Sequence, residues 1–381
     1  MNCKKSEFNL DPNLTYLNCA YMSPLMTNVE QAGIQGIKRK QQPNTISGDD
    51  FFTDGDLLRA QFAKLINSNQ PDRSVIIPSV SYGMANVAKN LKLNPGDNIV
   101  LVGEQFPSNV YPWMEVANKA KAEIITVAPP KQNQNRSQVW NQTILDSINE
   151  RTKLVACGHI HWADGTIFDL RSIRHKTFET GAWLVIDGTQ SLGALPFDLQ
   201  QLKPDALIAA GYKSLMGPYS IGMAYYGPVF DGGVPVEQNW INRFESENFA
   251  NLVNYNENYQ TGALRYEVGE HSNFILVPML LEAIKKLNQW NPVNIQEYLK
   301  ELVSEPIEIL RESGFIIESE DQRASNLFGI RLGENHRIEH LKSKLAEANV
   351  FVSFRGDAIR VSPGVYNDSK DLATLTDALT S

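Results

Sequence analysis

Short apolar runs, each stopped by glycine, proline or polar residues, recur along the first two thirds of the chain. The two clearest runs are 182–186, which stops at Asp187, and 205–210, which stops at Gly211. Continuous apolar runs of this length are typical of strands buried on both faces of a parallel sheet. The same interpretation predicts further strands at 73–78, 97–102, 123–127 and 153–157.

A different pattern begins near residue 277, where amphipathic helices alternate with short strands. We expect helices at 280–287, 295–313, 338–348 and after residue 369. We expect strands at 315–318 and 326–332, and a hairpin at 351–362 that turns at Gly356-Asp357. This alternation predicts a small α+β domain at the C-terminus.

The chain has 381 residues, which is long enough for two domains or one large one. We expect an α/β fold in three parts. An N-terminal arm and helix over 1–50 joins the small domain, a large domain spans 51–275, and the small α+β domain spans 276–381.

Composition and net charge limit the classes of molecule that we expect the protein to bind. The chain is 42% hydrophobic and 20% charged, which is typical of an ordinary globular protein. Its net charge of −8 and its pI near 5.4 argue against a general nucleic-acid surface. We therefore expect a small-molecule partner and no nucleic acid.

The cysteines and the apolar stretches indicate the cellular compartment that we expect for the protein. Cys3, Cys19 and Cys157 cannot all pair and lack the spacing of a metal site, so a reducing cytoplasm fits best. The first residues lack the apolar core of a signal peptide, and the longest apolar runs are far shorter than a membrane span. His159 and His161 alternate at a strand end without a third ligand nearby, so we expect no metal. The expectation is a cytoplasmic protein that uses neither metal nor membrane.

Two of the predicted strands end beside an acid and an amine. Asp187 follows the first clear run, and Lys213 follows the second. Ligands of parallel sheets bind beyond the carboxyl ends of the strands. An amine that forms an imine and a carboxylate that pairs with a pyridine nitrogen are what pyridoxal phosphate (PLP) requires of a protein. Taken alone, the pair is also compatible with two solvated strand-end charges.

The segment 79–88 predicts a strand, a turn and then a helix. A serine at the helix cap and small residues in the first turn let backbone N–H groups approach an anion, which the helix dipole favours. As a bare pattern, the segment is more often an ordinary capped helix.

The segments 185–194 (VIDGTQSLGA) and 210–218 (AGYKSLMGP) resemble the PLP enzymes of the class V aminotransferase group. That group includes cysteine desulfurases, kynureninases and isopenicillin N epimerase-like proteins. The resemblance implies the PLP-dependent transferase fold, aspartate aminotransferase-like, whose large domain holds a mainly parallel seven-stranded sheet. It also implies that Lys213 forms the imine with the cofactor and that Asp187 holds the pyridine nitrogen.

Further segments in the same order extend the resemblance over about residues 14–370. It implies that Val80 and Ser81 bind the cofactor phosphate, that Phe106 stacks on the cofactor ring, and that Trp162 stands where relatives usually have a polar residue near the ring oxygen. It further implies that Gln190 reaches the ring oxygen and Tyr212 the phosphate.

The resemblance also names substrate contacts. The segment 359–367 (IRVSPGVYN) is similar to the family segment whose arginine binds the substrate carboxylate, which here is Arg360. A planar guanidinium suits that bidentate contact. Arg355, His161 and Asn18 are the further expected substrate contacts. In relatives the loop 261–273 reaches across a homodimer to the partner's phosphate, but here Glu270 replaces the usual threonine, and a carboxylate repels a phosphate.

The resemblance leaves the reaction open. The desulfurases of this group need a mobile cysteine shortly before the arginine segment, and no cysteine follows Cys157, so we do not expect a desulfurase. We expect aminotransferase chemistry on an α-amino acid. The alternatives are a Cβ-lyase of the kynureninase kind, an amino-acid epimerase, and a catalytically silent relative that kept the fold.

Overall fold

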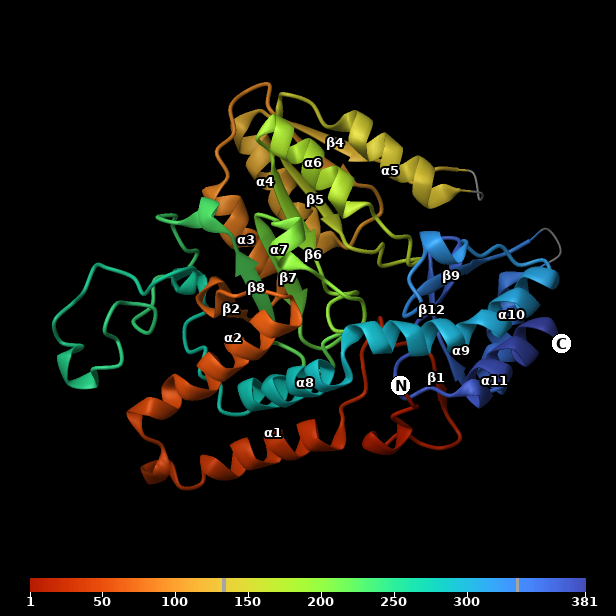
Figure 1. The fold of residues 1–381 in the computed structure, drawn as a ribbon, viewed down its shortest axis with the longest axis horizontal. Helices are drawn as coiled ribbons and strands as arrows, with labels where there is room; N and C mark the ends of the chain where they lie inside the picture. Colours follow the sequence, from red (N-terminus) through yellow and green to blue (C-terminus); the bar gives the residue numbers. More distant parts are fainter. Residues whose placement is uncertain (132–134, 334–335) are drawn as a thin grey trace.

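The computed structural model describes residues 1–131, 135–333 and 336–381. Its centre is a seven-stranded sheet in the order β2-β8-β7-β6-β5-β3-β4 (Figure 1). The strands are β2 (Ser74–Ile77), β3 (Asn98–Val102), β4 (Glu123–Val127), β5 (Thr152–Gly158), β6 (Trp183–Asp187), β7 (Ala206–Ala210) and β8 (Gly222–Tyr226). Strand β8 runs antiparallel to both of its neighbours, and the other pairings are parallel. The predicted α/β fold with a mainly parallel seven-stranded sheet is confirmed.

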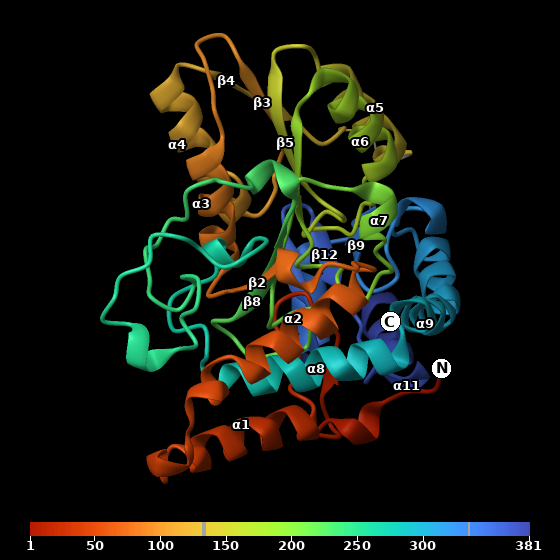
Figure 2. The ribbon, with the colours of Figure 1, turned by 60° about the vertical axis from the view of Figure 1, so that its left-hand side comes forward.

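Helices cover both faces of this sheet (Figure 2). One face carries α3 (Val80–Asn90) and α4 (Tyr111–Ala120). The other carries α2 (Thr53–Leu65), α5 (Arg136–Ser147), α6 (Leu170–Thr180), α7 (Leu199–Leu202) and α8 (Leu276–Trp290). Alternate residues of β3 enter the two cores: Ile99 packs under α3 and α4, whereas Val100 packs in the opposite core. Burial on both faces explains why these strands are continuous apolar runs in the sequence.

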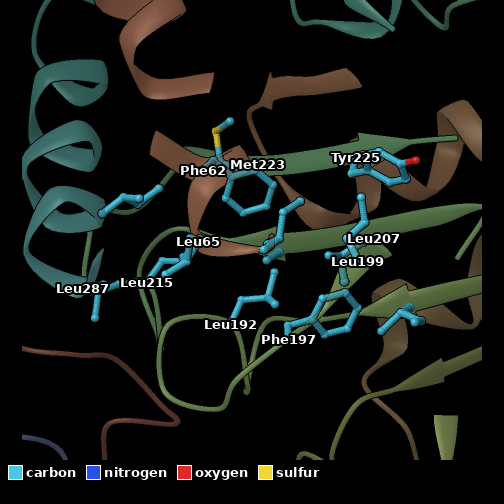
Figure 3. Packing of buried hydrophobic residues seen from close by; sticks show 14 of the residues in the cluster. Phe62, Leu65, Leu192, Phe197, Leu199, Leu207, Leu215, Met223, Tyr225 and Leu287 are labelled. Atoms are coloured by element: carbon cyan, nitrogen blue, oxygen red, sulfur yellow. The ribbon is translucent and has the colours of Figure 1, made fainter. Parts of the chain in front are cut away.

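The larger of the two cores lies between the sheet and the helices α2 and α8 (Figure 3). Leu207 and Met223 project from β7 and β8 toward Phe62 of α2, while Leu287 of α8 closes the same cluster. The first long helix, α1 (Thr27–Arg39), packs outside α8 (Figure 1). Helix α8 thus packs mainly on α1 and α2, although the sequence assigned it to the small domain, and the boundary at residue 275 stays a prediction.

The C-terminal part contains a three-stranded antiparallel sheet in the order β11-β12-β9. Its elements are β9 (Phe328–Arg331), β11 (Ser353–Arg355), β12 (Ala358–Val361), and the helices α9 (Pro292–Glu312), α10 (Ile338–Glu347) and α11 (Ser369–Thr380). The hairpin turns at Gly356-Asp357, as the sequence predicts. The strand expected at 315–318 is reduced to one bridge between Ile316 and Arg331.

The N-terminal arm lies against this C-terminal part. Strand β1 (Thr15–Tyr16) pairs in parallel with β10 (Val350–Phe351). The chain continues past the small sheet, where Asn18 forms a bridge with Ser362. Among the described residues, no helix is long and apolar enough to cross a membrane.

A buried carboxylate ties the large sheet to the small one. Asp164, in the loop after β5, accepts from Arg331 of β9 (2.5 Å) and from Arg136 of α5 (3.4 Å). It also pairs with His161 Nδ1 at 3.1 Å. Burial alone raises the pKa of a carboxyl, but His161 and the two arginines outweigh it and hold the pKa of Asp164 well below its usual range. The charge of Asp164 therefore stabilises the contact between the two sheets.

We predict that Asp164→Ala lowers the free energy of unfolding by about 3–5 kcal/mol, because it leaves two buried guanidinium groups without their carboxylate. Urea unfolding followed by circular dichroism measures this loss. The matched control is Asp357→Ala, since Asp357 also pairs with Arg331 (3.2 Å) but is 75% exposed. That change should cost less than about 1 kcal/mol. Equal losses in both variants would contradict the prediction.

Candidate active site

A cavity of about 320 Å³ lies beyond the carboxyl ends of β6 and β7. Asp187 is the last residue of β6, and Lys213 follows β7 by three residues. Both line this cavity, so the fold brings together the acid and the amine that the sequence singles out. Six more of the predicted site residues line it as well: Val80, Ser81, Phe106, Trp162, Gln190 and Tyr212.

A larger cavity of about 690 Å³ lies elsewhere, between α6, α7 and the start of α9. Two of its carboxylates, Asp169 and Asp198, accept backbone N–H groups at the starts of α6 and α7. These acids serve as helix caps. The amine of Lys213 and the carboxylate of Asp187 both line the smaller cavity. We therefore place the candidate site in the smaller cavity.

Lys213 is a buried amine, 6% exposed. Its Nζ lies 4.9 Å from the centre of the Phe106 ring and 5.4 Å from that of Tyr212. Burial lowers the pKa of Lys213 to about 8; Asp187 opposes this shift and the charge of Arg360 adds to it. A large fraction of this amine is therefore uncharged, and nucleophilic, at mildly alkaline pH.

The turn that carries Lys213 into the cavity needs a glycine. Gly211 donates its N–H to the carbonyl of Ile221 at 2.8 Å. A Cβ added to Gly211 would stand 2.6 Å from that carbonyl oxygen, which no side chain tolerates. The glycine that ends the apolar run in the sequence thus lets the chain turn tightly before the lysine.

Asp187 is held by the residues that follow it. The Thr189 N–H donates to Asp187 Oδ1 at 2.9 Å, and the Thr189 hydroxyl accepts from the Ala210 N–H of β7 at 3.1 Å. Burial raises the pKa of Asp187, while the hydrogen bonds from Thr189 partly oppose the shift. A cationic N–H group beside this carboxylate would be strongly favoured. Thr189 lines the cavity and was missed by sequence reasoning, although an Asp-x-Thr sequence at a strand end is a known turn signal.

The N-terminus of α3 forms one end of the cavity. The Ser79 hydroxyl caps the helix by accepting from the Tyr82 N–H at 3.2 Å, and it lies 2.9 Å from the Ser81 hydroxyl. Gly83 lets the helix approach the sheet, because a Cβ there would meet Ile208 Cγ2 at 2.8 Å. Backbone N–H groups, two hydroxyls and the positive end of the helix dipole suit an anion such as phosphate.

Several further lining residues were not among the predicted site residues. Ser108, Tyr219 and Ser220 reach the cavity from loops that carry no distinctive pattern. Ser220 has a φ of +66°, which is uncommon outside glycine and marks a constrained backbone beside the cavity. Tyr219 packs on the Tyr212 ring with a centroid separation of 4.5 Å.

Phe106 and Trp162 form an aromatic wall. Their rings meet edge to face with centroids 5.6 Å apart. The Trp162 indole N–H donates to the carbonyl of Glu104 at 2.6 Å, which fixes the loop that carries Phe106. His161 Nε2 lies 3.2 Å from the same carbonyl, so His161 has both ring nitrogens engaged and is buried. The structure places His161 behind the wall. The expected contact of His161 with the substrate stays a prediction, and this position does not favour it.

Arg360 of β12 is buried, with 1% of its surface exposed. Its Nη1 donates to the carbonyl of Trp162 at 3.0 Å and its Nη2 to the Ser353 hydroxyl at 3.3 Å. Burial lowers the pKa of Arg360 to about 10, with Arg355 contributing. Among the described residues, no carboxylate pairs with this guanidinium, and its Nε has no partner. A buried cation without an anion is costly, so the position favours an anionic ligand.

Asn18 and Gln190 connect the site to the N-terminal arm. The Ser353 hydroxyl donates to Asn18 Oδ1 at 2.8 Å, so Asn18 orients the serine that contacts Arg360. Gln190 Nε2 donates to the carbonyl of Ala20 at 3.1 Å, and in the described part of the chain its buried Oε1 has no partner. The structure thus brings Asn18 to the arginine and Gln190 to the cavity wall.

The two histidines that alternate after β5 face different surroundings. His159 packs edge to face on Phe197, and burial lowers its pKa to about 4. His161 pairs with Asp164 instead. Within the described residues, no group of three or more His, Cys, Asp or Glu side chains could hold a metal ion.

These residues fit pyridoxal phosphate. The cavity offers an amine of lowered pKa, a buried carboxylate, a helix N-terminus suited to an anion and an aromatic wall in one volume. Among the described residues, Gln190 Oε1 and Arg360 Nε have no hydrogen-bond partner, and a bound molecule could satisfy them.

The loop 261–273 is held by a second buried carboxylate. Glu267 accepts two hydrogen bonds from Arg59, each at 2.8 Å, and one from the Ile76 N–H at 2.8 Å. Burial raises the pKa of a carboxyl, but Arg59 and His271 lower that of Glu267 to about 2. Glu270, three residues later, is exposed and has a φ of +55°. The loop is therefore anchored through Glu267 on the N-terminal side of Glu270.

Comparisons with known proteins identify the family of the chain. The family model described as Aminotransferase class-V matches residues 49–375 of the chain. The uncharacterized aminotransferase YcbU of Bacillus subtilis is 25% identical over 332 residues, which cover 85% of this chain and 82% of YcbU.

Two solved structures share the fold. The cysteine desulfurase CsdA of Escherichia coli has a TM-score of 0.80 at 20% identity, covering 98% of this chain and 96% of CsdA. A variant of C-DES, a cystine C–S lyase, with glycine covalently linked to its PLP cofactor has a TM-score of 0.86 at 18% identity, covering 99% of each chain. At these identities the likeness is one of fold, and it confirms the predicted fold of PLP-dependent enzymes.

The low pKa of Lys213 leads to a pH prediction. Covalent attachment of an aldehyde needs the unprotonated amine, so attachment of pyridoxal phosphate to the cofactor-free protein should rise with pH with a midpoint near 8. Arg360→Gln should move this midpoint upward, because the charge of Arg360 lowers the pKa of Lys213. Visible absorbance measured across a pH series gives the midpoint, with Lys213→Ala as the unreactive control. A midpoint near 10.5, the value of an ordinary lysine, would contradict the assignment.

Proposed function

The chain belongs to the class V aminotransferase family of PLP-dependent enzymes, and from this premise we propose that it is an aminotransferase that acts on the amino group of an α-amino acid. The observation that carries the proposal is the cavity in which a buried amine, Lys213, and a buried carboxylate, Asp187, lie beside the N-terminus of α3. The helix N-terminus suits the phosphate of the cofactor, the carboxylate suits its ring nitrogen, and the amine suits its aldehyde.

When bound, pyridoxal phosphate supplies an aromatic ring that withdraws electrons from the α-carbon of an attached amino acid. We assign the phosphate to the N–H groups of Val80 and Ser81 and to the Ser81 hydroxyl, with Tyr212 beside them. Asp187 keeps a proton on the ring nitrogen, because a buried carboxylate favours a cation next to it. The Phe106 ring packs on the cofactor face, supported by Trp162.

The remaining site residues act on the substrate. Gln190 contacts the ring oxygen with its side-chain amide, and Arg360 binds the α-carboxylate of the substrate. Lys213 Nζ would hold the cofactor, and its amine would take up the proton from the α-carbon of the substrate. A pKa near 8 suits this role, because the amine is then a base whose protonated form can return the proton.

The same geometry disfavours a desulfurase. That reaction needs a reactive thiolate at the cofactor, and no cysteine follows Cys157 in the chain. Cys19 is the cysteine whose charge would reach Lys213, but it is buried, and burial raises its pKa to about 11. Cys157 is buried as well. A Cβ-lyase or an epimerase would use the same loss of the α-proton, and both remain the alternative reactions.

We further propose a cytoplasmic homodimer whose partner covers the mouth of the cavity. Apolar side chains gather there: Tyr219 lines the cavity and is 61% exposed, and Tyr21, beside the Ala20 that Gln190 contacts, is 55% exposed. The segment 238–260 extends away from the body of the molecule and exposes Val253 and Tyr255 (Figure 1). Exposed apolar surface of this kind is typical of an interface between subunits.

Transamination has a distinct stoichiometry. We predict that the holoenzyme, given an α-amino acid and a second keto acid, forms the keto acid of the first substrate only when the second is present. Lys213→Ala should lose at least about 10³-fold of this activity, because both the covalent attachment and the α-proton transfer depend on it. Chromatography of the keto acids measures the product. Ammonia release without a second keto acid would indicate a lyase, and inversion at the α-carbon an epimerase.

The dimer proposal predicts an effect of Glu270. If the loop 261–273 faces the partner's phosphate, Glu270→Thr removes a repelling carboxylate and should lower the Kd of the cofactor-free protein for pyridoxal phosphate by about tenfold. Calorimetry measures the Kd, and Glu301→Thr, an exposed acid on α9, is the matched control. An unchanged Kd in Glu270→Thr would place the loop away from the phosphate.

A further inference from the structure

Two arginines project from the same face of the β11–β12 hairpin. Ser353 pairs with Arg360 and Arg355 with Ala358 across the two strands. Paired residues, and residues two apart on one strand, share a face of the sheet. The guanidinium groups of Arg355 and Arg360 therefore leave the hairpin on one side. The small side chain of Ala358 leaves space opposite Arg355.

That side is the cavity wall formed by Trp162. The guanidinium carbon of Arg355 lies 5.6 Å from the centre of the Trp162 indole, and that of Arg360 lies 5.8 Å from it. Trp162 lines the cavity that contains Lys213. The charges of both arginines reach that amine, because each lowers the pKa of Lys213. Both arginines thus act at the same end of the site.

Within the part of the chain that the structure describes, neither arginine has an anionic partner. Arg355 donates to the carbonyl of its own neighbour, Phe354, at 2.8 Å, and Arg360 donates to a carbonyl and a hydroxyl. No carboxylate within the described ranges lies within 4.0 Å of either guanidinium, although Asp357 in the same hairpin pairs with Arg331. The hairpin therefore presents two positive charges that the chain itself does not neutralise.

In the proposed reaction, other residues bind the charged groups of the cofactor, so both arginines remain available to bind the substrate. Asp187 serves the ring nitrogen, and the helix N-terminus of α3 serves the phosphate. One α-carboxylate satisfies Arg360, and a second anion is needed for Arg355. Resting on the proposed function, we propose that the substrate is an α-amino acid whose side chain ends in a carboxylate, with Arg355 as the residue that selects it. Arg355 Nη atoms make the charge-assisted bond to the side chain, and Trp162 fixes the separation of the two carboxylates.

Matched substrate pairs test this selection. L-aspartate and L-asparagine, like L-glutamate and L-glutamine, differ in charge at nearly constant shape. With the holoenzyme, at least one acid should have a kcat/KM at least about tenfold above that of its amide, as expected for one charge-assisted pair. Arg355→Gln should remove this preference mainly through the KM of the acids, and Arg355→Lys should restore part of it. Arg337→Gln, an exposed arginine of the same C-terminal part, is the control.

A binding measurement gives a readout besides activity. Glutarate and butyrate differ by one carboxylate, and calorimetry with the holoenzyme should show glutarate binding at least about tenfold more tightly. Arg355→Gln should abolish that difference. Equal binding of the two compounds, or acids that react no faster than their amides, would overturn the proposal while the enzyme still forms keto acids. The absence of a visible band and of keto acid from any amino acid would instead refute the proposed function itself.

Discussion

Burial of the Lys213 amine within reach of the Asp187 carboxylate is the arrangement on which the rest of the site depends. Desolvation lowers the pKa of the amine and raises that of the acid, so burial disfavours the charged form of both groups. Folding must compensate for this cost, and it does so with continuous apolar strands that are buried on both faces. The same strands end at one edge of the sheet and thereby set the acid and the amine in one cavity.

The second half of the site is supplied by segments remote in sequence. Asn18 of the N-terminal arm orients Ser353, Ser353 contacts Arg360, and Arg360 contacts the carbonyl of Trp162. Asp164 joins the same loop to β9 through Arg331. The position of Arg360 therefore depends on how the small sheet docks on the large one. The buried carboxylate at that junction links the stability of the fold to the geometry of the site.

Several parts of the site could be predicted from the sequence because their signals are local. The apolar runs gave β6 and β7, and the residues that end them gave Asp187 and Lys213. The serine-capped start of α3 was likewise visible. His161 was harder to interpret, because its partner Asp164 and the carbonyl of Glu104 are joined to it only by folding. Tyr219 and Ser220 carried no pattern at all, since loops place them at the cavity without periodicity.

The sequence by itself determined the α/β class, the sheet-forming runs and the acid and amine at their ends. Strands that are buried on both faces, and the residues that end them, can be recognised from consecutive residues. Only the tertiary structure decided that Arg355 and Arg360 share one face beside Trp162, that Arg360 has no carboxylate among the described residues, and that α8 packs on α1 and α2. These facts depend on which distant side chains meet. Strand pairing, strand register and the balance of charge in a cavity each depend on several segments, so none of them can be recognised from one segment alone.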